Sequence, residues 1–364
     1  MARTITPSLN KSRLVAYEGA TLNAETPLHL LDPALTPIEH FFVRNNGVWP
    51  DLPMEDADAW TFTVGGSVER SRRWQLSELK EDFEIVSLTA VLECAGNGRA
   101  MLDPPVEGVA WGLGAVGCAR FTGVRLRDVL SACEPLPEAV YTAHHSPDRT
   151  AGGAVALSRG LPLWKAAAPE TLLAFAMNDA PLPFEHGGPL RVIAPGFPGS
   201  AWQKWVDRID LRDRVHDGAK MNGLDYRLPE RPLAPDDDAA QTQFNVIEDM
   251  PVRSIITAPS AQLRLHVGAP VDIAGWAWAG RIPVSAVHVS SDGGRSWERA
   301  ELDSTEERWA WRRFRWTGVA NAPGPIEIIA RAFDVLGRSQ PLSSQWNPRG
   351  YCNNACHRIV LGVI

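Results

Sequence analysis

Short apolar segments, rather than long helical stretches, set the pattern of this chain. Residues 60–70 and 84–94 alternate or run apolar with β-branched side chains, which predicts two strands, and residues 190–196 predict a third. Apolar spacings of three and four predict short helices at residues 75–81 and 122–133. We therefore expect the first part of the chain to mix strands with a few short helices.

A change of pattern follows residues 228–238, whose three prolines and run of Asp are typical of a linker. Beyond it, β-rich segments alternate with turn signals at residues 262–267, 271–278, 285–291, 308–316 and 326–333. The sequence Ser291, Asp292, Gly293, Gly294 predicts a hairpin between two strands. This spacing is typical of an antiparallel β-sandwich, so we expect one domain over residues 1–240 and a second over 241–364.

Composition is that of a globular protein, with 364 residues, 45% of them hydrophobic and 22% charged. Basic residues number 36 and acidic residues 43, and the net charge of −7 argues against a general nucleic-acid binder. No apolar run is long enough to span a membrane, and the N-terminal segment carries neither a Sec nor a twin-arginine leader pattern. We expect a cytoplasmic protein, or a periplasmic one if an export leader has been trimmed.

Five cysteines are too few, and odd in number, for a disulfide framework, so the question is which of them has a chemical role. Cys94 is the strongest candidate, because it ends an apolar strand and enters a Gly-Asn-Gly turn. Arg99 lies close in sequence, and a nearby cation favours the thiolate that binds metals or attacks carbonyls. The alternative is a buried cysteine that packs as a small hydrophobe.

Three other patterns have weaker meanings. Gly112, Gly114 and Gly117 match a dinucleotide fingerprint, but two prolines replace the strand that should precede it, which favours a turn-rich loop. The run CNNACH over residues 352–357 resembles a c-type haem attachment with one extra residue, and small residues packed at a strand end are the simpler interpretation. Cationic side chains near residues 44, 186, 191 and 204 are either solvated charges or a cradle for phosphate.

Taken in chain order, longer segments resemble the sulfite oxidase family of molybdopterin-dependent oxidoreductases. FVRNN (42–46) is similar to that family's F-x-R-N-H, ECAGNGR (93–99) to its C-A-G-N-x-R, and ARFTGVRLRDVL (119–130) and HGGPLRVIAPGFPGSAWQKW (186–205) to two further motifs. SSDGGRSWERA (290–300), RWAWRRF (308–314) and WNPRGYCNNACHRI (346–359) resemble the family's dimerisation domain. The resemblance spans residues 40–360, and no segment resembles the family's b-type haem domain, so it is to the haem-free bacterial type.

The resemblance implies an α+β protein, in which a mixed α/β molybdopterin domain precedes an immunoglobulin-like β-sandwich that forms a homodimer. It assigns Cys94 as the single protein ligand to molybdenum, and a soft thiolate suits the sulfur-rich dithiolene of the cofactor. The cofactor-binding residues that it implies are Phe42, Val43, Arg44, Asn45, Asn46, Asp148, His186, Arg191, Trp202, Gln203 and Lys204. The catalytic pocket that it implies comprises Arg44, Arg99, Trp111, Tyr226 and Arg312, the last from the second domain.

The implied activity is oxidation of sulfite to sulfate by oxygen-atom transfer, with electrons passed to a c-type cytochrome or to oxygen. Three arginines and a phenol would hold the anion, and Tyr226 and Arg312 favour sulfite over nitrate as the substrate. The alternatives are a related molybdopterin enzyme acting on nitrate or a sulfoxide, a non-catalytic β-sandwich binding protein, and a cysteine hydrolase that uses Cys94 and His186.

Three positions depart from the family pattern. Asn46 stands where the family has His, so we expect one altered cofactor contact. Gly98 stands where Arg is common, which removes a positive charge next to Arg99. Phe121 replaces a Trp, and we expect that change to affect packing alone.

Overall fold

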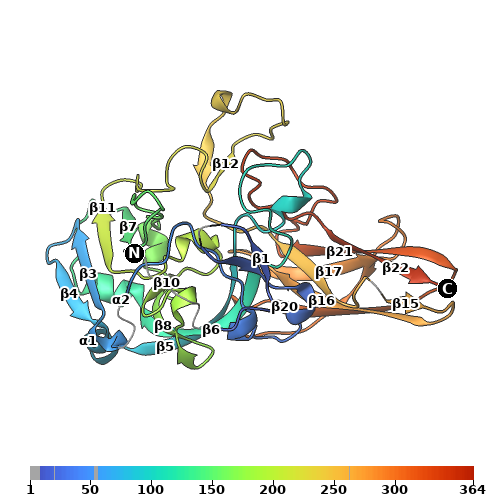
Figure 1. Ribbon diagram of the computed structural model, residues 1–364, viewed down its shortest axis with the longest axis horizontal. Coiled ribbons are helices and arrows are strands. Elements are labelled where there is room, and N and C mark those ends of the chain that lie inside the picture. Colours follow the sequence, from blue (N-terminus) through green and yellow to red (C-terminus); the bar gives the residue numbers. More distant parts are fainter. Residues whose placement is uncertain (1–8, 20, 53–55, 262) are drawn as a thin grey trace.

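The computed structural model describes residues 9–19, 21–52, 56–261 and 263–364. Residues 1–8, part of the segment that lacks a leader pattern, lie outside this range. The described chain forms two lobes arranged along one long axis, a mixed lobe from the first half and a strand-rich lobe from the second (Figure 1). Its helices are short, and none of those described has the length and apolarity of a membrane span.

Two sheets build the first lobe. One has the order β10 (Arg191–Ile193), β8 (Leu172–Met177), β6 (Val116–Arg125), β5 (Ile85–Glu93), with β9 (Ala180–Pro181) paired to β8. The other has the order β4 (Arg72–Gln75), β3 (Thr61–Gly66), β11 (Arg208–Arg212), β7 (Tyr141–His145), in which β3 and β11 are parallel. The predicted strands at 60–70, 84–94 and 190–196 are thereby confirmed.

Helices in this lobe are few: α1 (Leu76–Asp82), α2 (Leu126–Ser131) and α3 (Leu163–Ala166). The predicted helix at 75–81 is confirmed, whereas the one at 122–133 was wrong at its start. Residues 122–125 complete β6, because both of its edges are paired: Val124 faces Ile85 of β5 and Leu173 of β8. Single 3-10 turns form at Leu28–Leu30, Ile38–His40, Ala57–Ala59, Arg99–Met101, Phe184–His186, Gly199–Ala201 and Ala239–Gln241, and β1 (Val15–Tyr17) pairs β2 (Asn23–Glu25).

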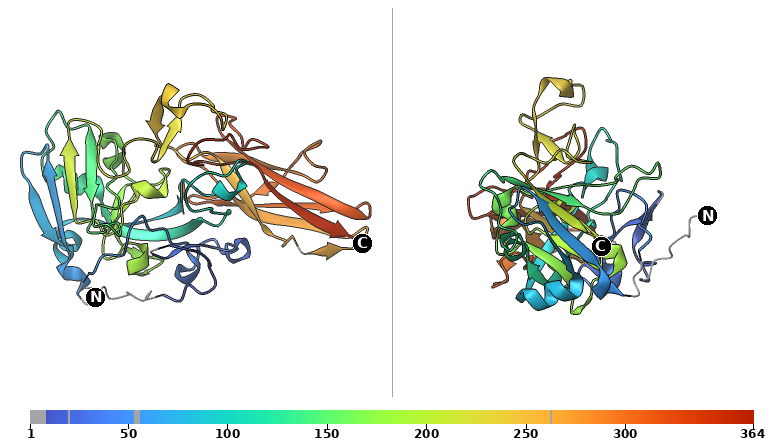
Figure 2. Two further views of the ribbon diagram at one scale, coloured as in Figure 1. Left: turned by 45° about the horizontal axis from the view of Figure 1, so that its top comes forward. Right: turned by 90° about the vertical axis from the view of Figure 1, so that its left-hand side faces the viewer.

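The predicted linker is more structured than its composition suggests. Its first residues form β12 (Arg227–Pro229), which pairs with β13 (Phe244–Val246). The chain between these strands projects from the body of the molecule, as the yellow segment in Figures 1 and 2 shows. Prolines at its base interrupt regular pairing, so the excursion carries only this short ladder.

Two sheets form the second lobe, as predicted for a sandwich. One has the order β14 (Arg253–Ala258), β16 (Pro270–Trp278), β20 (Arg312–Val319), β19 (Glu301–Leu302). The other has the order β15 (Arg264–Leu265), β22 (His357–Val363), β21 (Gly324–Asp334), β17 (Val284–Ser290), β18 (Glu298–Arg299). Their inner faces bury Val, Ile, Ala and aromatic side chains in one core.

Most predicted strands of this lobe are confirmed, and the hairpin at Gly293 and Gly294 joins β17 to β18. The segment 308–316 becomes a strand only from Arg312, because Trp309 instead pairs with Ala90 of the first lobe. Of residues 262–267, only Arg264 and Leu265 are in a strand, and Gln262 lies outside the described residues.

Two tryptophans of the second lobe pack against the first lobe. The Trp276 and Trp311 rings stack with centroids 4.9 Å apart and bury against Leu31 and Val116 of the first lobe. Trp276 Nε1 donates to Leu31 O at 2.6 Å, so the aromatic contact is oriented as well as apolar. The segment that follows β5 therefore runs along a packed interface between the lobes.

Candidate functional site

Cys94 lies where β5 ends, at the junction of two cavities. Its backbone is held by hydrogen bonds from Cys94 N to Ala115 O and from Asn97 N to Cys94 O, each 2.9 Å long. Cys94 is 8% exposed, yet it lines both cavities. A cysteine placed in this way is reachable by a ligand, unlike Cys118, which is wholly buried in the interface between the lobes.

The first cavity encloses about 680 Å³, part of it open to solvent, and brings together the basic residues of the predicted cradle. Arg191 donates to the carbonyls of His186 at 2.6 Å and Trp202 at 2.9 Å, and Lys204 donates to Glu185 O at 3.0 Å and to the Asn45 side chain. These bonds fix the cations in place along the cavity wall.

Burial lowers the pKa of three cations that line this cavity, His186, Arg191 and Lys204. It lowers the pKa of Arg191 to about 9 and, together with neighbouring cations, the pKa values of His186 and Lys204 well below their usual range. Lys11, whose Nζ lies 3.0 Å from His186 Nε2, has its pKa lowered to about 7 by burial. Two acidic side chains, Asp148 and Glu185, also line the cavity, and burial raises the pKa of Asp148. These buried cations can therefore bind an anionic group.

Two buried polar atoms in the same cavity lack a hydrogen-bond partner among the described residues, Arg191 Nε and Ser200 Oγ. Buried polar atoms are normally satisfied, so these two indicate a polar ligand. A phosphate-bearing cofactor with sulfur ligands fits this donor set. The cations can donate hydrogen bonds to its phosphate, and the thiol of Cys94 is a soft ligand for a metal at the sulfur end of the cofactor. The predicted cofactor residues that line the cavity are Phe42, Arg44, Asn45, Asn46, Asp148, His186, Arg191, Trp202, Gln203 and Lys204. Val43 does not line it, and its backbone pairs with Ala24.

The second cavity, of about 570 Å³, is lined by arginines of both lobes. Arg44, Asn46, Cys94 and Tyr226 border both cavities, so the two spaces meet at the cysteine. Arg99 and Arg349 line the second cavity alone, with Tyr351 beside them. A small anion in this space would face guanidinium groups on more than one side.

Two residues predicted for this pocket lie elsewhere. Trp111 is fully buried and lines neither cavity, and its ring packs edge-on to Tyr17 with centroids 4.9 Å apart. Arg312 borders a separate cavity within the sandwich, where it donates to Asp303 O and Val284 O. The prediction for Arg312 is therefore corrected: β20 begins at this residue, and its side chain turns along its own sheet.

Arg349 is the residue of the second lobe that reaches the pocket in place of Arg312. It lies in the loop before β22, where it forms ion pairs with Glu107 at 2.5 Å and Asp225 at 3.8 Å, and its Nε has no partner among the described residues. The signal for it was present in WNPRG, where an arginine precedes Gly350 at φ 59°.

The departures from the family pattern have different consequences. Asn46 Oδ1 accepts hydrogen bonds from Arg44 at 3.0 Å and from the Tyr226 hydroxyl at 3.2 Å, so Asn46 links cofactor and pocket residues. Phe121 packs edge-on against Trp202 with centroids 5.7 Å apart, as a packing role requires.

The weaker motifs do not form sites among the described residues. Gly112, Gly114 and Gly117 lead into strand β6 rather than a helix, as expected of a loop. His357 begins β22 and accepts a hydrogen bond from Ile256 N at 2.9 Å, which ties it to the sheet. No hydrogen bond in the described part of the chain joins His186 to Cys94, and the cysteine-hydrolase alternative needs one.

Comparison with known proteins agrees with this geometry. Residues 49–220 match the oxidoreductase molybdopterin binding domain, and residues 244–364 match the Mo-co oxidoreductase dimerisation domain. Mouse mitochondrial sulfite oxidase is 34% identical, covering 94% of this chain and 64% of the relative, and chicken sulfite oxidase is 32% identical, covering 92% and 75%. The chain thus spans somewhat under two thirds of the length of the mammalian relatives.

Other relatives carry different activities in their names. Barley nitrate reductase [NAD(P)H] is 30% identical, covering 94% of this chain and 41% of the relative. The solved structure of the sulfane dehydrogenase SoxCD from Paracoccus pantotrophus superposes with a TM-score of 0.80 at 26% identity, covering 97% of this chain and 90% of that one. From its two matched domains and its 32% identity with chicken sulfite oxidase, of which it covers 75%, the chain belongs to the sulfite oxidase family of molybdopterin-dependent oxidoreductases.

Proposed function

We propose that this chain is a molybdenum–molybdopterin enzyme that oxidises sulfite to sulfate by oxygen-atom transfer. The observation that supports the proposal is the position of Cys94, which joins a cationic cavity to a cavity lined with arginines. The first matches the needs of a phosphate-bearing cofactor and the second those of a small oxyanion.

The cofactor side is assigned to the residues of the first cavity. Cys94 would hold the metal through its thiolate, and His186, Arg191 and Lys204 would hold the phosphate end. When bound, the molybdopterin supplies the two-electron redox centre and a transferable oxygen. Binding of the phosphate would also offset the burial of these cations, since each gains an opposite charge.

On the substrate side, Arg44, Arg99 and Arg349 attract and orient the anion. Guanidinium groups offer forked donors that match the oxygens of sulfite. The Tyr226 hydroxyl donates its one proton to Asn46 Oδ1 at 3.2 Å, so it would donate to an anion oxygen, or move a proton at that oxygen, in place of this bond. Because these groups are fixed before substrate arrives, they can stabilise charge without reorganising.

The test is metal content together with turnover. We expect molybdenum in the purified protein, and an absorption spectrum that changes when sulfite is added. Steady-state rates with sulfite, nitrate and methionine sulfoxide, each with suitable electron donors or acceptors, separate this proposal from its relatives' activities. Absence of molybdenum would favour a non-catalytic β-sandwich protein, and absence of sulfite turnover with every acceptor would remove the proposed substrate.

Two partners belong to the proposal. The segment matched to the dimerisation domain supports a homodimer, which light scattering on the purified chain measures. Electrons released by the reaction pass to a separate acceptor, a c-type cytochrome or oxygen. Reduction of added cytochrome c, compared with oxygen consumption, identifies which of these acceptors is used.

A further inference from the structure

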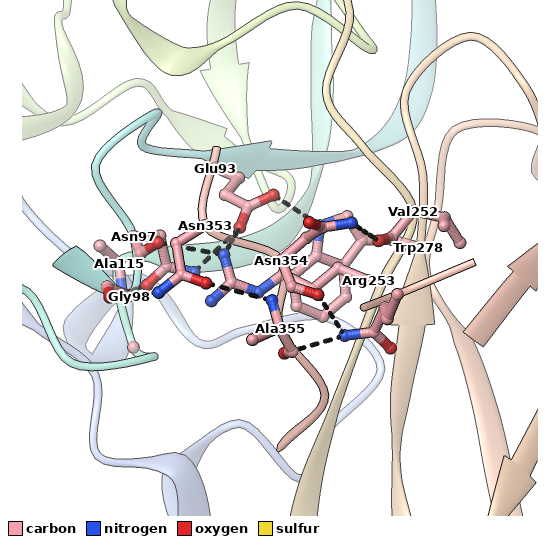
Figure 3. Close-up of polar contacts among 12 residues, drawn as sticks. Glu93, Asn97, Gly98, Ala115, Val252, Arg253, Trp278, Asn353, Asn354 and Ala355 are labelled. Atoms are coloured by element: carbon pink, nitrogen blue, oxygen red, sulfur yellow. Dashed lines mark hydrogen bonds and ion pairs between the residues drawn. The ribbon is translucent and has the colours of Figure 1, made fainter. Parts of the chain in front are cut away.

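The second lobe binds the short segment that carries Cys94 through Glu93, the residue just before it (Figure 3). Glu93 is 3% exposed, and its Oε1 accepts from Arg253 of β14 at 2.7 Å while its Oε2 accepts from Trp278 Nε1 at 2.7 Å. Asn97 Nδ2 donates to Glu93 Oε1 at 3.0 Å from within the segment. Both carboxylate oxygens are therefore satisfied, and both by donors from the second lobe.

Arg253 also occupies the space beside Gly98. A Cβ added at Gly98 would lie 2.8 Å from a terminal nitrogen of Arg253 and 3.2 Å from Asn353 Nδ2. Gly98 has φ +85°, and its carbonyl accepts from Asn353 at 2.7 Å, while Asn97 O accepts from Arg253 at 3.2 Å. The guanidinium thus fills the volume that any side chain at position 98 would enter.

These contacts explain how a buried carboxylate is accommodated next to Cys94. A buried carboxylate needs a paired cation, since an unpaired buried charge is strongly destabilising. Next to Glu93, the described cation that meets this need is Arg253, which is itself 3% exposed. Its Nη1 donates both to the carboxylate of Glu93 and to Asn97 O, so one nitrogen of the second lobe joins these two residues.

We infer that Arg253 is a positioning residue of the reaction site: from the second lobe it pairs with Glu93 and bonds the peptide of Asn97, and so fixes the segment that presents Cys94 and Arg99. The inference rests on the proposed function only for the role of Cys94 as metal ligand. The positioning itself is a property of the folded chain and is measured without turnover.

The first experiment is amide hydrogen exchange on the full chain carrying Arg253→Gln. We expect exchange of the amides of residues 94–99 to accelerate by about tenfold or more, because the second lobe no longer holds them. Asp32→Asn is the matched control, since it breaks another ion pair between the lobes, with Arg313 at 2.6 Å, that does not touch this segment. The inference predicts no change at residues 94–99 in that variant.

The second experiment keeps the charge and changes the side chain. Arg253→Lys retains the positive charge that Glu93 needs but lacks the guanidinium nitrogen beside Gly98, so exchange at residues 94–99 should lie between that of the wild type and that of Arg253→Gln. In the loaded enzyme, the shift of the thiolate–molybdenum absorption band should follow the same order. Should Arg253→Gln fail to fold, exchange in Arg253→Lys as slow as in the wild type would overturn the inference.

Unchanged exchange at residues 94–99 in Arg253→Gln, or faster exchange in Arg253→Lys than in Arg253→Gln, would overturn the inference. Failure of the proposed function has a different signature. In that case wild-type protein shows no sulfite turnover while the exchange differences between the variants persist.

Discussion

Arg99 Nε donates to the backbone carbonyl of Arg349 at 2.9 Å, although the two residues lie 250 positions apart and in different lobes. Arg99 also lies over the Tyr351 ring at 5.4 Å, so two residues of the second lobe position one pocket arginine. The anion pocket is consequently a product of the interface between the lobes. An isolated first lobe would carry Cys94 and its cationic cavity but only part of the substrate pocket.

Changing Arg99 or Arg349 to Gln should raise the KM for sulfite by about tenfold to a hundredfold, because each change removes a charge-assisted hydrogen bond to the anion. The KM of each variant should also depend less on salt than that of the wild type. Arg312→Gln is the matched control and should leave KM unchanged, since Arg312 borders a different cavity. Steady-state kinetics at two ionic strengths measure all three, and an altered KM in Arg312→Gln alone would contradict the assignment.

Replacing Cys94 by Ser should abolish turnover while leaving the fold intact. The substitution is nearly isosteric, and the hydrogen bonds that hold position 94 come from its backbone. A hydroxyl is a poor ligand for a soft, sulfur-rich metal centre, so the loss should appear in the metal site itself. Circular dichroism and thermal melting test the fold, and activity close to the wild type in this variant would exclude Cys94 as the metal ligand.

Substitutions at Trp111 and Tyr226 should distinguish a packing role from a role in the anion pocket. Trp111→Phe should lower the stability by about 1–3 kcal/mol through lost packing but leave KM and kcat close to the wild type, because the ring lines neither cavity. Tyr226→Phe should leave stability nearly unchanged and lower kcat/KM by about tenfold, because one hydroxyl contact at the anion is lost. Denaturant unfolding and kinetics on both variants make the comparison, which fails if Trp111→Phe is the variant that loses activity.

Local and long-range features differ in how well the sequence predicts them. Strands β3 and β5 and helix α1 follow from apolar spacing, because each buries one continuous face. The start of α2 was misplaced because residues 122–125 pair with strands on both sides, which spacing within one segment does not encode. The cofactor residues came as a set from long motifs, whereas Arg349 and Arg253 depend on how the lobes dock, and that contact joins residues far apart in the chain.

Lys11 should make the stability of the cofactor-free chain rise with pH. Its pKa is lowered to about 7 by burial, against an ordinary value of 10.5, so between these values the folded state has the neutral amine and the unfolded state the protonated one. The unfolded state then binds more protons, and the free energy of unfolding increases with pH by about 1 kcal/mol per pH unit. Urea unfolding at pH 7.5, 8.25 and 9 should show this slope, and Lys11→Met should reduce it by about 1 kcal/mol per pH unit without removing it, because burial also lowers the pKa of Lys204. A slope that is unchanged in Lys11→Met would show that Lys11 is not among the titrating groups.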